Sequence, residues 1–167
     1  MPVKTVHELF VEQLRDMYHA EKQLARALPK MAKAASSDKL RQGLERHKEQ
    51  TEGQVDRLEQ VFDSLDERKR GKRCEAMEGL IEEAQEMIEE IKTPEVRDAA
   101  LVAAAQKVEH YEIASYGTLR ALAEAMGHKD AERLLAETLE EEKQMDQNLN
   151  QLALSEINKT ALQQAAE

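Results

Sequence analysis

Two glutamates and a tyrosine share one face of a long stretch with helical periodicity. Glu109, Glu112 and Tyr116 are separated by three and four residues, so they lie on the same side of an α-helix. Leu101 and Leu119 continue this face on either side, which directs both carboxylates toward the expected core. A buried carboxylate is costly unless it binds a metal ion or accepts hydrogen bonds, and two on adjacent turns are costlier still. The spacing therefore predicts a metal site or a hydrogen-bond network inside the protein.

Three other helical stretches carry polar residues on their otherwise apolar faces. Glu21 interrupts the first stretch, His47 and Gln50 the second, and Glu142 the last. Carboxylates and an imidazole in the core of a helical bundle are the ligand types of dinuclear iron or manganese centres. The sequence predicts an iron or manganese site, dinuclear or mononuclear, built from Glu21, His47, Gln50, Glu109, Glu112 and Glu142.

Composition and the residues that mark helix ends predict the helices that must position these residues. Charged residues make up 35% of the 167-residue chain and aromatic residues only 3%, a mixture rich in helix formers and poor in strand formers. Thr5 and Glu8 form a capping box, Thr93-Pro94 marks a helix start, and Gly127 marks a helix end. The last ten residues are expected to fray. The pattern predicts core helices at about 5–35, 37–67, 94–127 and 129–157, and a crossover helix at about 74–91.

The connections predict the architecture. Two short turns make antiparallel hairpins of the first two and the last two long helices, while the intervening helix of about 18 residues, roughly 27 Å long, can return the chain along the bundle. The expected fold is a single all-α domain over residues 1–167, a ferritin-like four-helix bundle with one long crossover. Counting from the turns places Glu21 level with Gln50 and Glu112 level with Glu142, so these four residues are expected in one layer.

The candidate ligands depart from the usual dinuclear set, which has one Glu from each of two helices and Glu-x-x-His from each of the other two. Gly53 and Met145 stand three residues after Gln50 and Glu142, where histidines would be expected. Gln50 is itself a neutral amide in place of a bridging carboxylate. Because an amide oxygen can bind a hard cation but supplies no charge, the alternatives are weaker binding, a mononuclear site or an asymmetric pair.

The net charge and the single cysteine indicate which binding partners and which cellular compartment to expect. The formal net charge of −10 disfavours nucleic acid and anionic membranes as partners. The longest apolar run, residues 99–105, is far too short to span a bilayer. Cys74 is the single cysteine, so no intrachain disulfide can form, and a reducing, cytoplasmic location is expected.

Four stretches of the chain are together specific enough to indicate a family. They are YHAEKQL at 18–24, CEAMEGLIEE at 74–83, EHYEIASYGTL at 109–119 and TLEEEK at 138–143. The sequence resembles the YciF/YciE-like family of bacterial stress proteins, which are ferritin-like, over essentially its whole length. The resemblance implies a helical bundle, a homodimer and a dinuclear metal site. The family pattern H-L-x-E-T corresponds to residues 47–51, which read HKEQT, so Gln50 replaces the family glutamate.

Two functional hypotheses remain open at this point. The first is a cytoplasmic ferritin-like stress-response protein whose metal performs redox chemistry with peroxide or dioxygen. Tyr18 and Tyr116 lie within about one turn of candidate ligands, where they could bind a carboxylate, act as redox-active side chains or simply fill the core. The alternative is a non-catalytic helical dimer with a degenerate metal site that acts as a structural or interaction module.

Overall fold

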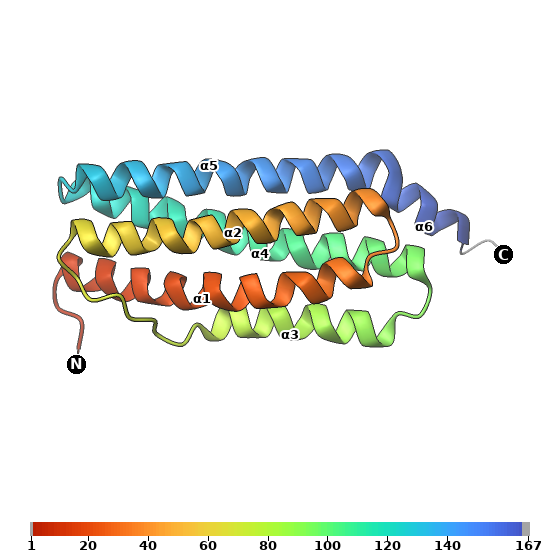
Figure 1. Ribbon diagram of the computed structural model, residues 1–167, viewed down its shortest axis with the longest axis horizontal. Helices are drawn as coiled ribbons and strands as arrows, with labels where there is room; N and C mark the ends of the chain where they lie inside the picture. The colour runs from red at the N-terminus through yellow and green to blue at the C-terminus, as the bar shows by residue number, and fades with distance from the viewer. Residues whose placement is uncertain (1, 165–167) are drawn as a thin grey trace.

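Four long helices run side by side in the computed structural model, which describes residues 2–164 (Figure 1). They are α1 (Val6–Ala34), α2 (Asp38–Ser64), α4 (Pro94–Ala125) and α5 (Lys129–Leu152). The shorter α3 (Glu75–Glu90) packs outside them against α1 and α4. A π-helical turn, η1 (Ala153–Ile157), follows α5 and leads into α6 (Asn158–Gln164). This is the all-α bundle with one long crossover that the sequence predicts.

The helices begin and end at recognisable sequence signals. Thr5 and Glu8 form the expected capping box at the start of α1, and the Ser37 side chain caps α2. Gly127 adopts a φ of 75° at the α4–α5 turn, a backbone conformation that glycine adopts without the steric cost of a Cβ. Pro29 lies inside α1, which continues to Ala34.

The predicted fraying of the last ten residues is wrong for most of that segment. Residues 158–164 form α6, which packs against α4, and contacts with a neighbouring helix stabilise a short helix that would be marginal alone. Residues 165–167, also part of that prediction, lie outside the described residues.

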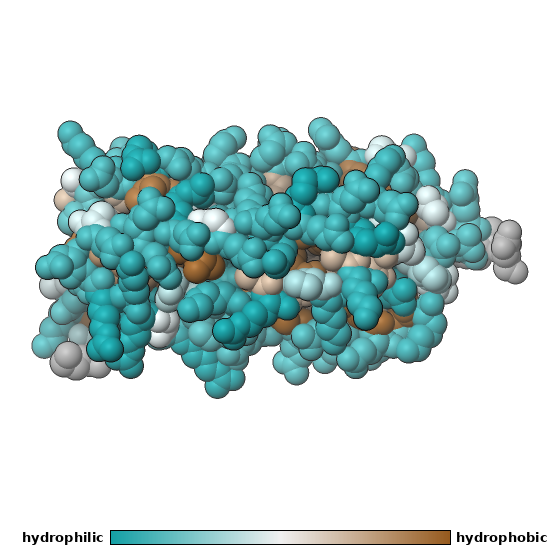
Figure 2. Space-filling model, in the orientation of Figure 1, coloured by the Kyte–Doolittle hydropathy of each residue, from teal (hydrophilic) through white to brown (hydrophobic). Residues whose placement is uncertain are grey.

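Apolar stripes on the long helices meet along the bundle axis. On α1 the buried residues Phe10, Leu14, Met17, Leu24 and Leu28 recur every three to seven positions and are at most 1% exposed. Burying a side chain of this size stabilises the fold by roughly 1.5–3 kcal/mol. The face shown in Figure 2 is mostly hydrophilic, with small apolar patches visible among the hydrophilic side chains.

The two hairpins pack so that each long helix has two neighbours. α1 contacts α2 and α4, while α5 contacts α2 and α4. α3 carries the chain back along the outside of the bundle to the end at which α4 begins (Figure 1). Between Pro2 and Gln164, no helix combines the length and apolar character needed to cross a membrane.

A buried carboxylate fastens the α1–α2 turn to α4. Asp98 is 3% exposed, and it accepts hydrogen bonds from the backbone amides of Ser36 and Ser37, at 2.8 Å each, and from the Ser36 hydroxyl. These bonds join the two hairpins at the end of the bundle where the chain enters α4.

Replacement of Asp98 by alanine should destabilise the protein by about 3 kcal/mol, because buried amides lose a charged acceptor. Asp56→Ala, at an exposed position of α2, is the matched control and should change the free energy of unfolding by less than about 0.5 kcal/mol. Urea unfolding of both variants measures the difference. Equal losses would show that the Asp98 contacts contribute no more than a surface carboxylate.

Candidate metal centre

Four polar side chains from three helices meet in the bundle core. His47 of α2, Glu109 and Glu112 of α4, and Glu142 of α5 each offer a potential ligand atom, and these atoms lie within 4.8 Å of one another. The Glu109 Oε1 atom is 3.3 Å from His47 Nδ1, and the Glu142 Oε2 atom is 3.8 Å from His47 Nε2. All four side chains are at most 1% exposed. We refer to them as the His47 cluster.

Glu21 extends the His47 cluster toward α1. It is fully buried, and its carboxyl group interacts with those of Glu112 and Glu142. The Tyr116 hydroxyl on α4 donates a hydrogen bond to Glu21 Oε1. Three of the long helices therefore supply carboxyl groups to the core, and α2 supplies the imidazole.

The helical spacing in α4 produces the central part of this arrangement. Glu109, Glu112 and Tyr116 are all buried, as are Leu101 and Leu119 on the same face. The spacing of three and four residues keeps the side chains on one stripe. The placement of these two glutamates and this tyrosine in the core agrees with the prediction from sequence.

Many ligand atoms of these side chains have no hydrogen-bond partner among the described residues. They include both ring nitrogens of His47 and both carboxyl oxygens of Glu109 and Glu112, together with one oxygen each of Glu21 and Glu142. Buried polar atoms are normally paired, and leaving one unpaired costs roughly 1–3 kcal/mol. The set consists of oxygen and imidazole nitrogen donors, which fits iron or manganese.

Burial shifts the protonation of the whole group toward its neutral forms. Burial, with the charge of Glu142 nearby, raises the pKa of Glu21 to about 8. The pKa values of Glu109 and Glu112 are raised well above the ordinary value, chiefly by burial and then by neighbouring carboxyl groups. Burial lowers the pKa of His47 to about 4. A divalent cation would reverse the preference for protonated carboxyls, because it stabilises carboxylate anions.

Gln50 lies at a groove beside the His47 cluster, and Tyr18 bonds to a residue outside the cluster. Gln50 is half-buried and lines a groove between α2 and α5, while His47 is buried. Three residues advance a helix by about 300°, so Gln50 is turned about 60° away from His47. The hydroxyl of Tyr18 donates to Glu59 at 2.7 Å, not to a candidate ligand.

A second polar group beside the His47 cluster was not anticipated. Gln54 is fully buried, interacts with Glu142, and donates to Glu141 at 2.9 Å. Arg57 binds both Glu141 oxygens, at 2.8 and 2.9 Å, and also donates to Thr138. Burial raises the pKa of Glu141, but the hydrogen bonds from Arg57 and Gln54 outweigh it and hold that pKa below its ordinary value. Glu141 is therefore an anionic link between α2 and α5.

One signal in the sequence pointed to Gln54. It stands seven residues after His47, which returns it to nearly the same helix face. The Arg57–Glu141 pair has no comparable signal, because both residues lie among many other charged residues of their helices.

The fold and the buried donor set define a ferritin-like four-helix bundle with a candidate carboxylate–histidine metal centre. Residues 5–162 match the family described as Domain of unknown function (DUF892), and the chain belongs to that family. It is 56% identical to protein YciF of Escherichia coli strain K12 over 162 residues, covering 96% of this chain and 98% of YciF.

Solved structures of other proteins share this helical-bundle fold. The crystal structure of the E. coli stress protein YciF matches with a TM-score of 0.90 and 55% identity, over 94% of this chain and 99% of that one. YcfI from Rhodopseudomonas palustris matches with a TM-score of 0.87 and 49% identity, over 89% and 94% of the two chains. A Xanthomonas campestris protein at 22% identity, with a TM-score of 0.76 over 96% and 99% of the chains, shares the fold.

The metal-free protein should lose stability as the pH rises from about 6.5 to 8. Glu21 has a folded pKa of about 8 against an ordinary value of 4.5, so the folded state holds protons that the unfolded state has released, and stability falls as pH rises. His47, with a folded pKa of about 4 against 6.5, has the opposite effect, which is confined to pH values below about 6.5.

Urea midpoints of chelator-treated protein at pH 6.5 and 8.0 measure this change, and Glu21→Gln should reduce it. A midpoint that rises over this range would contradict the assigned protonation of the buried carboxyls.

Proposed function

We propose that this protein is a metal-binding, ferritin-like stress-response protein that holds iron or manganese in the His47 cluster. The observation that carries the proposal is the convergence of four buried donors within 4.8 Å, with nearly all of their ligand atoms unpaired among the described residues. A purely structural core would need hydrogen bonds to these side chains, and the described part of the chain supplies almost none to the cluster. The description of the relative YciF as a stress protein supports the physiological assignment.

The residues have distinct roles in this proposal. His47, Glu109, Glu112 and Glu142 would hold a metal ion, and Glu21 would supply a further buried carboxylate beside them. Tyr116 holds the orientation of Glu21 through their hydrogen bond. Bound iron or manganese would supply redox chemistry toward peroxide or dioxygen, while the closely packed bundle excludes bulk water from the site.

The proposal also includes a homodimer in the cytoplasm. The homodimer follows from the resemblance to YciF-like proteins, and the cytoplasmic location from the single cysteine of the chain. Size-exclusion chromatography with light scattering would test the dimer directly.

Glu112→Ala and Glu142→Ala should each abolish metal binding, because both remove a buried anionic donor. The loss should exceed the roughly 10–100-fold reduction in affinity typical of losing a residue that only supports a ligand. Glu140→Ala, the exposed neighbour of Glu142 on α5, is the control and should retain full metal content.

Elemental analysis after growth with iron and manganese, together with titration calorimetry, gives the stoichiometry. Since removing a buried carboxyl also relieves a burial cost, the metal-free variants should remain folded by circular dichroism. Unchanged metal content in both variants would refute the proposed site.

A non-catalytic helical dimer with a degenerate site is the second candidate. Gln50 favours it, because this half-buried residue lines the groove beside His47 with a neutral amide and brings no charge. The relative YcfI, provisionally described as a structural protein, also supports this reading.

Gln50→Glu separates the two candidates. If the neutral amide of Gln50 limits a dinuclear centre to one ion, the substitution should raise the bound metal from about one to about two ions per chain, the dinuclear stoichiometry. Gln42→Glu, one of the lining residues of the same groove but two turns away, controls for the added surface charge. Equal stoichiometry in Gln50→Glu and the parent would show that position 50 does not limit the site.

A further inference from the structure

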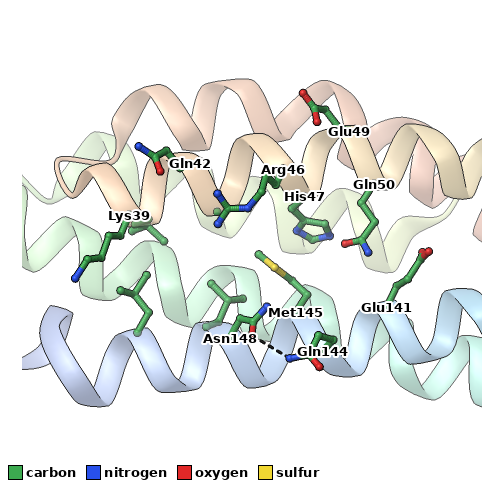
Figure 3. Close-up of a pocket in the computed structure, with 14 residues that line it drawn as sticks. Lys39, Gln42, Arg46, His47, Glu49, Gln50, Glu141, Gln144, Met145 and Asn148 are labelled. Carbon is green, nitrogen blue, oxygen red and sulfur yellow. Dashed lines mark hydrogen bonds between the residues drawn. The ribbon is translucent and has the colours of Figure 1, made fainter.

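A groove between α2 and α5 reaches the His47 cluster from the surface. It encloses about 890 Å³ and is lined on α2 by Leu40, Gly43, His47 and Gln50, and on α5 by Met145 and Leu149. We call it the α2–α5 groove. Figure 3 shows His47, Gln50 and Met145 directed into the space between the two helices. His47 is therefore shared between the groove wall and the buried cluster.

On the other three faces of the bundle, none of the hollows considered below leads to the His47 cluster. α3 covers the side formed by α1 and α4. The hollows along α1 and α2, near Pro29 and near Arg26, contain no residue of the His47 cluster in their walls. The hollow between α4 and α5 near His110 contains none either.

The α2–α5 groove is lined by oxygen donors, and its charged lining residues balance one another. Its polar lining comprises the side-chain amides of Gln42, Gln50, Gln144 and Asn148, the carboxylates of Glu49 and Glu141, and the cationic groups of Lys39 and Arg46. Amide and carboxylate oxygens can replace part of the water shell of a divalent ion. The net charge of −10 raises the local concentration of cations around the protein.

We propose that the α2–α5 groove is the path by which a divalent metal ion passes between solvent and the buried cluster, with His47 at its inner end. This inference rests on the proposed metal-binding function and adds the route. The ion exchanges groove oxygens for the imidazole and then for the carboxyl groups behind it. Rates of metal entry and exit depend on the open cross-section of the groove, whereas the amount bound at equilibrium depends on the cluster.

Gly43 offers a way to close the groove without disturbing the cluster. It lies one turn before His47 on the same face of α2, and a Cβ built there has no atom within 4 Å. Gly43→Cys can be modified after folding with a bulky maleimide. The native Cys74 is 1% exposed and, unlike His47, does not line any of the hollows described above, so the introduced thiol is the accessible one. Gly53→Cys, also on α2 with no atom within 4 Å of its Cβ and outside the groove, is the matched control.

Cobalt(II), followed by its visible absorption, is the probe for the route. The modified Gly43→Cys protein should load cobalt and release it to a chelator at least 10-fold more slowly than the modified Gly53→Cys protein. The final amount bound should be the same in both. Equal rates in the two modified proteins would overturn the assignment of the route, even where the metal site itself is confirmed.

A second readout follows the accessibility of His47 in the metal-free proteins. His47 is only 1% exposed but lines the groove, so diethyl pyrocarbonate must enter through the groove to modify its neutral imidazole, and mass spectrometry reports the modification. The label at position 43 should slow this reaction at least 10-fold relative to the label at position 53. Absence of cobalt uptake by the unmodified protein would refute the proposed metal-binding function, whereas equal protection of His47 by the two labels would refute the groove as the path to the cluster.

Discussion

Glu21, Glu109, Glu112 and Glu142 lie in the core of the bundle with at most 1% of their surfaces exposed, around the equally buried imidazole of His47. Removing an ionised carboxylate from water without compensation costs more than a single domain can tolerate, so such groups take up protons or bind a cation. The raised pKa values of the four glutamates express the first response. The second response is the one that would give these residues a function.

The surroundings of the cluster hold these side chains in place without neutralising them. Tyr116 donates to Glu21 from the next turn of α4, and Gln54 approaches Glu142 from α2. Gln54 is in turn fixed by Glu141, whose charge is balanced by the two-pronged contact with Arg57. The Arg57–Glu141 ion pair therefore joins α2 to α5, the two helices that also form the groove.

The sequence predicted the fold well because its local signals agree with one another. The capping box at Thr5, the restart at Thr93-Pro94 and the glycine at position 127 mark element ends that the structure retains. In α4 the helical period alone was enough to identify Glu109, Glu112 and Tyr116 as buried. Where a single element decides the outcome, period and capping are sufficient.

The parts of the site that depend on helix rotation were less accessible from sequence. Counting residues from a turn gives the height of a side chain but not its angle about the helix axis, so it does not show that His47 is buried while Gln50 is half-buried. The pairing of Arg57 with Glu141 spans 84 positions in the chain, and no local pattern distinguishes either residue from its charged neighbours. The C-terminal helix was underestimated for a related reason, since its stability comes from contact with α4 and not from its own composition.

The division of the cluster between two hairpins has a consequence for the order of folding. Contacts within the α1–α2 pair and within the α4–α5 pair join segments that are close in the chain, and such contacts form early at low entropic cost. Glu21 and His47 belong to the first hairpin, and Glu109, Glu112 and Glu142 to the second. In either hairpin alone these side chains would still face water. The penalty for burying them falls on the final docking of the two halves, so the latest step of assembly is the one most sensitive to pH and to the presence of a cation.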